Sequence, residues 1–231
     1  MAERSRYGDR GPSNIGKRLT LRVHTSAPTS TRCVAAAVPA AYPEPMSKHL
    51  AQADPERVPG ESRDWTFVLE GGCPECGWEP VPDVARLREA WDAALAAWPA
   101  LLAGPEAEAR PEPTVWSPLE YGSHARDMIR ALAVRIASMV EQEDPEFANW
   151  DGDLANVLRR DWAADPAELI RDIDRAGREA AAVLDRLGEA DWDRAGHRGD
   201  GVGFTVLSLF QYLQHDVSHH VMDARRAELG E

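Results

Sequence analysis

Apolar side chains recur at three- and four-residue steps through four long stretches of the chain. In the first stretch, residues 82–104, they return at Val84, Leu87, Trp91, Leu95, Trp98 and Leu102. The other stretches cover residues 118–142, 165–187 and 205–229. Because an α-helix turns once in about 3.6 residues, this spacing gathers the apolar side chains on one face. The pattern predicts four amphipathic helices.

Polar residues mark where these helices begin. Ser117, Pro118 and Glu120 have the order of a capping box with proline at the first helical position. Asp165 and Glu168 have the same three-residue spacing. A loop is predicted over residues 143–153, a short helical piece over 154–162 and a turn-rich connection over 191–204. Four helices of similar length predict an all-α protein, an antiparallel four-helix bundle.

The first 45 residues differ from the rest of the chain. They carry seven basic and three acidic side chains, with scattered Ser, Thr, Pro and Gly and no sustained period. This composition predicts a disordered N-terminal extension, followed by one helical domain over residues 46–231. A transit peptide is an alternative interpretation of the extension. We favour an over-extended start, because the sequence from Met46 reads like a natural beginning.

Charge and cysteine content restrict the class of protein. The net charge is −13, and an acidic chain without a basic stripe repels phosphate, so we expect no nucleic-acid partner. No stretch approaches the roughly eighteen apolar residues of a membrane-spanning helix, and no secretory signal opens the chain. Three cysteines are too few for a disulfide scaffold. We therefore expect a cytoplasmic protein without a membrane partner.

Histidines cluster in the fourth predicted helix. His215 and His219 are four residues apart, so their imidazoles share a face and can converge on one ion, whereas His220 points away by about 100°. His124 lies on the core-facing side of the second predicted helix and offers a third imidazole. Three imidazoles with an open fourth position describe a catalytic metal site. The alternative is that each is a hydrogen-bonded core histidine.

A second pair with the same spacing competes for this role. Asp216 and His220 are also four residues apart, on the neighbouring face of the same helix. A carboxylate and an imidazole together can also bind a metal. Asp223 and Arg226 indicate that this face looks toward solvent, so we favour the pair of histidines.

The motifs resemble a known family. The segment "VWSPLEYGSHARDM" followed by "QYLQHDVSHHVMDA" is similar to the DinB-like four-helix bundles, which include the N-terminal domain of mycothiol-dependent maleylpyruvate isomerase. In that family a His on the second helix and a His or Glu and a His four apart on the last helix hold the metal. Carried onto matching positions, the resemblance implies His124, His215 and His219 as the metal ligands. It covers residues 81–228.

The resemblance also implies an activity. Family members use a divalent ion to bind the thiolate of a low-molecular-weight thiol; we expect zinc, with nickel, iron and manganese as alternatives. Only Lys17 and Lys48 are lysines against 24 arginines, which is typical of GC-rich bacterial genomes and indicates mycothiol as the thiol. We expect a thiol S-transferase or isomerase that acts on a small electrophile in detoxification or stress response. A non-catalytic metal-binding or interaction bundle is the alternative, and either is compatible with a homodimer.

Two cysteines precede the first predicted helix. Cys73 and Cys76, in "EGGCPECGWEP", have the spacing of zinc knuckles and of redox pairs. A closed zinc site needs two further ligands, and the remaining Cys33 lies in the N-terminal extension. The Pro, Gly and Trp around the pair favour a tight turn. A redox pair is the next interpretation and a metal site the last.

Overall fold

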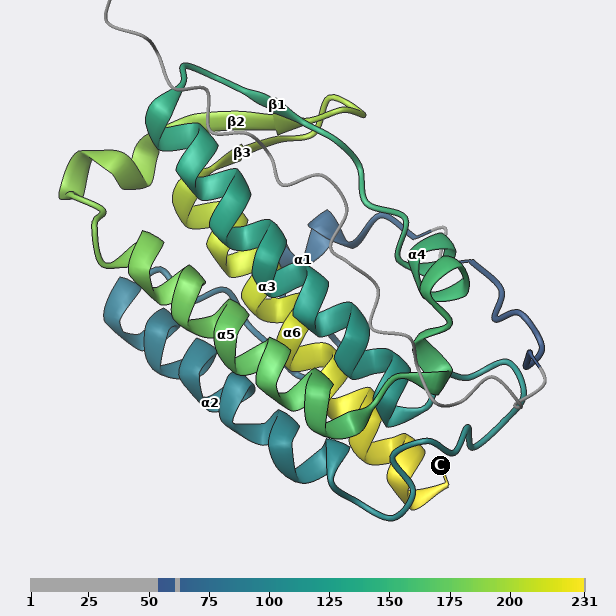
Figure 1. Cartoon of the computed structure of the whole chain (residues 1–231). Coiled ribbons are helices and arrows are strands. Elements are labelled where there is room, and N and C mark those ends of the chain that lie inside the picture. Colours follow the sequence, from purple (N-terminus) through teal and green to yellow (C-terminus); the bar gives the residue numbers. More distant parts are fainter. Residues whose placement is uncertain (1–53, 61–62, 231) are drawn as a thin grey trace, which may run out of the picture. The chain divides into compact units, whose positions relative to one another are not determined.

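Four long helices make up most of the protein (Figure 1). They are α2 (Val84–Leu102), α3 (Pro118–Glu141), α5 (Pro166–Leu184) and α6 (Val206–Leu229). Each lies within a few residues of a predicted stretch. The predicted all-α four-helix bundle is therefore confirmed.

The computed structural model describes residues 54–60 and 63–230. All of them belong to one unit of the chain, which begins at Pro45. The predicted disordered extension, residues 1–45, lies outside the described residues, as does the predicted domain boundary at residue 46. Both stay predictions.

The helices begin where their capping residues predict. The Ser117 hydroxyl accepts from the backbone N–H of Glu120, and the Glu120 carboxylate accepts from the N–H of Ser117, so the capping box at the start of α3 is complete. The Asp165 carboxylate accepts from the N–H of Glu168 at the start of α5. These bonds satisfy donors that the first turn of a helix leaves unpaired.

Helices α2 and α6 run in one direction and α3 and α5 in the other (Figure 1). The Arg194 carbonyl oxygen accepts from the N–H of Val206 at the start of α6, and its side chain donates to the carbonyl oxygen of Met139 near the end of α3, so these helices are antiparallel. An ion pair between Arg88 and Asp185 joins the first part of α2 to the end of α5. Helix α3 packs against α5 and α6, and α2 packs against the same two. Helices α2 and α3, consecutive among the four, are therefore diagonal partners.

The connection from α3 to α5 returns along the bundle. It contains β1 (Glu146–Phe147), α4 (Gly152–Arg159) and the 3-10 turn η2 (Asp161–Ala163). After α5 come a second 3-10 turn, η3 (Glu189–Asp193), and the strands β2 (Ala195–Arg198) and β3 (Gly203–Thr205). Strand β2 lies between β1, to which it is parallel, and β3, to which it is antiparallel. These strands were not predicted, because two to four residues are too short to show an alternating pattern.

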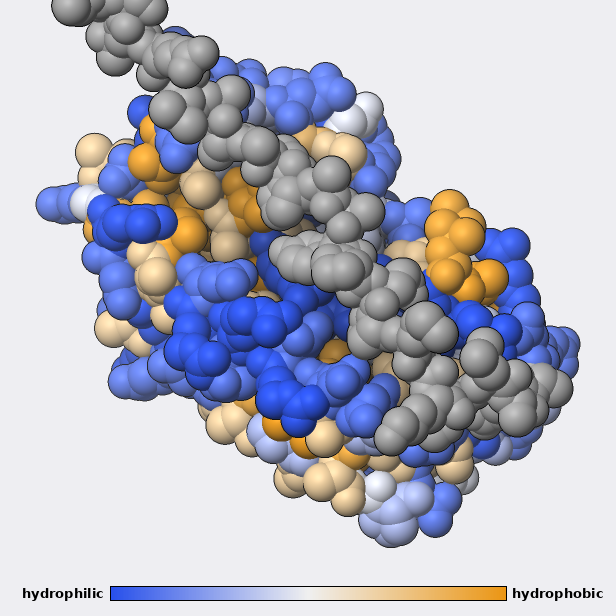
Figure 2. Space-filling model, in the orientation of Figure 1, coloured by the Kyte–Doolittle hydropathy of each residue, from blue (hydrophilic) through white to orange (hydrophobic). Residues whose placement is uncertain are grey.

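The core consists of the inward faces of the long helices. Its fully buried members include Leu87, Trp91, Trp98, Leu132, Ile136, Leu209, Phe210 and Leu213. Helix α4 differs because it exposes apolar side chains, which gather on the face shown in Figure 2; they are Leu154, Val157 and Leu158. Within the described part of the chain, no helix combines the length and apolar character needed to cross a membrane.

A short segment precedes α2 and packs on α6. It contains the 3-10 turn η1 (Trp65–Phe67), the one-turn helix α1 (Val68–Gly71) and the cysteines Cys73 and Cys76. Val68 is completely buried, and the Gln211 side chain on α6 donates to the carbonyl oxygen of Val81 at 2.8 Å. This segment brings residues from before the bundle to the helix that carries the histidines.

Candidate functional site

Helix α6 carries ligating side chains on two neighbouring faces. His215 and His219 lie on one face and meet Cys73 and Cys76; these four residues are the cysteine cluster. Asp216 and His220 lie on the next face and meet His124 from α3; these three are the aspartate cluster. Consecutive helical residues diverge by about 100°, so two overlapping four-residue spacings necessarily point to two different places.

The aspartate cluster brings three potential metal ligands together. One ligating atom of each residue lies within 4.8 Å of the others. Asp216 Oδ1 is 3.4 Å from His124 Nε2 and 3.8 Å from His220 Nε2, and it has no hydrogen bond among the described residues. The two imidazole rings stand at 90° to each other, 4.8 Å apart. Two imidazoles and a carboxylate form a donor set that binds divalent ions and leaves coordination positions open.

Neighbouring residues orient this cluster. His220 Nδ1 lies 3.0 Å from Asp223 Oδ2, which directs the other ring nitrogen toward Asp216. The Tyr121 ring stacks on His220 at 5.3 Å. On the far side, His124 packs close to the backbone of Gly152, where a Cβ would lie 2.6 Å from His124 Nδ1. The histidine can occupy this position because residue 152 has no side chain.

Charge favours an ionised carboxylate in the aspartate cluster. Burial alone would raise the pKa of Asp216. The nearby imidazoles of His124 and His220 outweigh this effect and lower the pKa to about 2. Burial alone would lower the pKa of His220, whereas its hydrogen bond to Asp223 and the charge of Asp216 raise it. Asp216 is therefore a carboxylate at neutral pH, the form that binds a cation.

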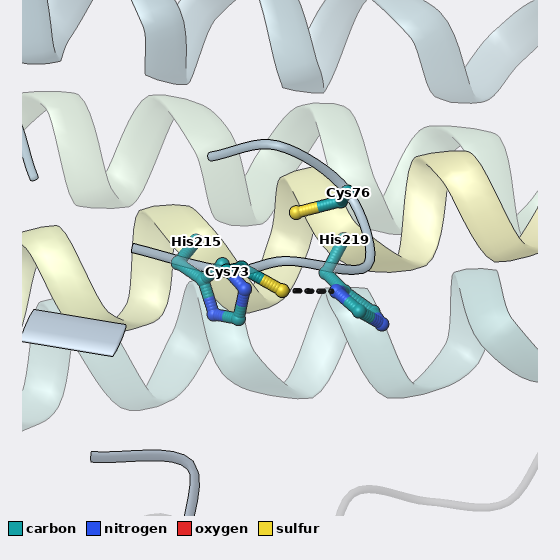
Figure 3. A group of neighbouring side chains, drawn as sticks. All are labelled: Cys73, Cys76, His215 and His219. Carbon is teal, nitrogen blue, oxygen red and sulfur yellow. Dashed lines mark hydrogen bonds between the residues drawn. The ribbon is translucent and has the colours of Figure 1, made fainter. Parts of the chain in front are cut away.

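The cysteine cluster places two thiols beside two imidazoles (Figure 3). One ligating atom of each residue again lies within 4.8 Å of the others. Cys73 Sγ is 3.5 Å from His219 Nδ1. His215 Nε2 is buried without a hydrogen-bond partner among the described residues. Cys73, His215 and His219 are 3%, 3% and 6% exposed and Cys76 is half-buried, so most of this cluster is shielded from solvent.

A tight turn sets the position of the two thiols. The N–H of Cys73 donates to the carbonyl oxygen of Trp78 at 2.7 Å, and the N–H of Gly77 donates to the carbonyl oxygen of Cys73 at 2.8 Å. Gly72 has φ 74° and ψ 178°, a conformation that is essentially restricted to glycine. A Cβ there would also lie 2.6 Å from the Trp78 oxygen. The predicted tight turn is therefore present, and it directs both thiols toward α6.

Aromatic rings cover the cysteine cluster. The Trp65 ring lies 5.0 Å from His219 and 5.9 Å from His215, and the Trp78 ring lies 5.1 Å from His215. The Trp78 indole N–H donates to the Gln214 side chain, which fixes the ring on α6. The two half-buried tryptophans therefore cover the histidines on this face of the helix.

The protonation of the cysteine cluster distinguishes between its interpretations. Burial, together with repulsion from His219, lowers the pKa of His215 to about 4, so its imidazole is neutral at pH 7. Burial raises the pKa of Cys76 to about 11, with Cys73 contributing. Redox-active cysteines have lowered pKa values, because the thiolate is the reacting form. The protein environment alone therefore disfavours Cys76 as a redox nucleophile.

The predicted ligand set is divided between the two clusters. His215 and His219 share a face, as predicted, and His220 lies apart from them. His124, however, meets Asp216 and His220, the pair that we had placed second. The side chains of His220 and Asp216 are 19% and 21% exposed, so their face is more exposed than that of His215 and His219, as predicted, but it lies close enough to α3 to meet His124. Metal binding by His124, His215 and His219 stays a prediction; the geometry does not gather the three at one point.

Two histidines that the sequence does not place near Cys73 and Cys76 lie beside them in the structure. We had ranked a metal site last for Cys73 and Cys76, because two more ligands were missing. His215 and His219 supply two ligating atoms beside them. A signal was present in the sequence, since C-x2-C and H-x3-H are the two halves of a known zinc-binding pattern. The 138 residues between Cys76 and His215 concealed it.

Comparisons with known proteins agree with the fold and the motifs. The sequence model of the DinB superfamily matches residues 86–222. No curated protein sequence matches the chain. Among solved structures, YfiT from Bacillus subtilis is similar, with a TM-score of 0.54 and 18% identity over 65% of this chain and 91% of YfiT. Its structure is described as "a probable metal-dependent hydrolase with an unusual four-helix bundle topology". The family match covers more than half of the sequence and confirms the resemblance, so the chain belongs to the DinB superfamily.

Proposed function

We propose that the protein is a metal-dependent enzyme that binds a divalent ion at His124, Asp216 and His220. We further propose that it transfers a low-molecular-weight thiol, mycothiol by the composition of the chain, to a small electrophile. The observation that carries the metal site is the convergence of three ligating atoms within 4.8 Å around an Asp216 oxygen that has no hydrogen bond among the described residues. YfiT, which has a similar fold and is described as a probable metal-dependent hydrolase, supports the metal dependence that we propose.

The donor set suits a zinc ion, and iron, nickel or manganese also accept imidazole and carboxylate ligands. A bound ion would lower the pKa of a coordinated thiol, so that a nucleophile exists at neutral pH. Asp216 contributes one negative charge and leaves a divalent site with net positive charge. That charge attracts an anionic thiolate.

Three residues of the chain prepare the site for this role. Asp223 accepts from His220 Nδ1 and thereby keeps Nε2 free to act as a ligand. The Tyr121 ring covers His220, and burial raises the pKa of its hydroxyl, so that Tyr121 stays a neutral donor. The side chain of Asp216 is 21% exposed, so the cluster lies near the protein surface, although its Oδ1 atom is itself buried.

We propose that a small electrophile binds in a cavity that Trp116 separates from the aspartate cluster, since none of the three cluster residues lines it. Its volume is about 80 Å³, and its wall includes Trp116, whose ring lies 5.7 Å from His124. Asn156 and Trp162 also line it, and each has a buried N–H group without a hydrogen-bond partner among the described residues. Unpaired buried donors favour a ligand with an oxygen acceptor, such as a carbonyl or carboxylate group.

A hydrolase is the second candidate, because the description of YfiT names hydrolysis. The same open site could use water in place of a thiol. The two reactions differ in their products: a transferase joins the thiol to the electrophile, and a hydrolase cleaves its substrate with water alone. A metal-binding bundle without turnover is the third candidate.

The test uses the full chain loaded with zinc. We expect an adduct of mycothiol with a small electrophile, such as monochlorobimane, to form faster than without protein, and His220→Ala to abolish this acceleration. Liquid chromatography with mass spectrometry identifies the product. Hydrolysis of an ester or amide substrate without thiol would replace the transferase proposal with the hydrolase. Loaded, folded protein that accelerates neither reaction would leave the non-catalytic bundle.

A further inference from the structure

We propose that Cys73, Cys76, His215 and His219 bind a second, structural zinc ion. This ion would join the segment before α2 to helix α6. The proposal concerns the cysteine cluster alone and does not depend on the reaction assigned to the aspartate cluster. Its basis is the donor set, the spacing, the geometry and the surroundings of these four side chains.

The donor set is one that structural zinc sites use. Two thiols and two imidazoles form a Cys2His2 site, and their sequence pattern is C-x2-C followed by H-x3-H. Each half of the pattern lies on a rigid element: the cysteines on a hydrogen-bonded turn and the histidines one turn apart on α6. Four ligands complete a tetrahedron and leave no position for a substrate. The expected role is therefore structural.

The observed separation fits tetrahedral coordination. Zinc binds sulfur at about 2.3 Å and nitrogen at about 2.0 to 2.1 Å, so a sulfur and a nitrogen on one tetrahedral zinc lie about 3.5 Å apart. Cys73 Sγ and His219 Nδ1 are 3.5 Å apart. The other ligating atoms lie within 4.8 Å of one another, so small side-chain rotations bring them to the same spacing.

Charge balance allows this ion to be buried. Two cysteine thiolates neutralise Zn²⁺, whereas an unbalanced charge would be costly at a site where Cys73 and His215 are each 3% exposed. Zinc also explains the unpaired nitrogen of His215, since a buried imidazole without a partner is unfavourable. A bound ion deprotonates a coordinating thiol, which overcomes the effect of burial on Cys76.

The surroundings of the cluster resemble the outer shell of a zinc site. His219 Nδ1 faces Cys73, and its other ring nitrogen lies 3.4 Å from Asp223 Oδ2 and 3.9 Å from Glu75 Oε2. A carboxylate beside the outer nitrogen of a metal-binding histidine fixes its tautomer and orientation. The rings of Trp65 and Trp78 cover the histidines. The cluster therefore has ligands, orienting carboxylates and an apolar cover.

A disulfide between Cys73 and Cys76 is the competing interpretation. It would consume both thiols and leave the two histidines without a common partner. The test therefore uses full-length protein that is kept reduced, so that both thiols are available to bind an ion. Replacement of zinc by Co²⁺ separates the two interpretations, because sulfur-to-cobalt charge transfer occurs only when thiolates bind the ion.

We expect reduced wild-type protein with Co²⁺ to show near-ultraviolet thiolate charge-transfer bands and the intense visible bands of a tetrahedral site. His124→Ala/His220→Ala should retain both sets of bands, because it removes ligands from the other cluster only. Cys73→Ser/Cys76→Ser should lose the charge-transfer bands, and zinc affinity at this site should fall by more than about 100-fold, the upper range for loss of an outer-shell partner. Far-ultraviolet circular dichroism checks that the variants fold.

X-ray absorption on zinc-loaded protein identifies the atoms that bind the ion directly. The His124→Ala/His220→Ala protein gives the cleanest spectrum, with two sulfur scatterers at about 2.3 Å and two nitrogen scatterers at about 2.0 Å. Absence of sulfur from the zinc shell of folded, reduced protein would overturn the proposal. So would charge-transfer bands that persist in folded Cys73→Ser/Cys76→Ser, because the sulfur would then come from elsewhere. Neither outcome affects the test of thiol transfer at the aspartate cluster.

Discussion

The aspartate cluster and the cysteine cluster use the same helix in opposite ways. In the aspartate cluster, three ligands from α3 and α6 stay partly exposed, with the side chain of Asp216 at 21% and that of His124 at 14%. In the cysteine cluster, four potential ligands come from α6 and the turn before α2; three of them are buried, and two tryptophans cover the histidines. Open coordination and access suit catalysis, whereas closed coordination and burial suit a structural role. The α6 residues of the two clusters are offset by a single position: His215 and His219 in one, Asp216 and His220 in the other.

One carboxylate connects the clusters. Asp223 Oδ2 lies 3.0 Å from His220 Nδ1 in the aspartate cluster and 3.4 Å from His219 Nε2 in the cysteine cluster. It therefore orients one histidine of each group. The comparison can be tested by changes that affect one cluster, and by a change at Asp223 that affects both.

The largest expected effect is the loss of one metal without the other. His124→Ala removes a ligand of the aspartate cluster, so we expect its metal affinity to fall by more than about 100-fold and turnover to cease. The cobalt–thiolate bands should persist. Isothermal titration calorimetry and absorption spectra of the same protein measure the two sites. Loss of both metals together would show that the clusters form a single site.

A smaller effect on both sites is expected from Asp223→Asn. The amide keeps the shape but removes the negative charge that orients His219 and His220, and loss of such a partner lowers metal affinity by about 10- to 100-fold. Titration with zinc should show weaker binding at both clusters. Asp174→Asn is the control, because this exposed carboxylate on α5 pairs with Arg178 and lies outside both clusters. A change confined to one cluster would remove Asp223 as their shared partner.

Gly72→Ala tests the turn that holds the thiols. The new side chain meets both an unfavourable backbone conformation and the Trp78 oxygen, so the free energy of unfolding should fall by about 1–3 kcal/mol. Zinc binding at the cysteine cluster should weaken, and the aspartate cluster should be unaffected. Gly71→Ala is the matched control, because no atom lies within 4 Å of the Cβ it would add. Equal denaturation midpoints for the two variants would contradict the role of Gly72.

Gly152→Ala should have the smallest effect, confined to the aspartate cluster. The added methyl group displaces the His124 ring, which can rotate at a cost of about 1 kcal/mol, or roughly fivefold in metal affinity. The control is Gly203→Ala, where the added Cβ has no atom within 4 Å. Calorimetric titration of both variants measures the difference. An unchanged affinity in Gly152→Ala would mean that His124 does not need its observed position to bind the ion.

Much of the fold could be predicted because its signals are local. The apolar period and the capping residues Ser117 and Asp165 act within a few residues along the chain, and each predicted long helix is present. The strands were missed because pairing between distant segments, rather than local pattern, creates them. Residues 195–198, for example, pair with residues 146–147 and 203–205.

The sequence by itself determined which residues of α6 share a face, because helical geometry fixes that His215 groups with His219 and Asp216 with His220. It also determined that the spacings of the His215–His219 pair, the Asp216–His220 pair and the two cysteines suit metal binding. Only the tertiary structure decided which face meets α3 and which meets the turn at Cys73. That choice depends on the rotation of α6 within the bundle and on the path of the segment before α2. Both result from the packing of many side chains that lie far apart in the sequence, so no local pattern records them.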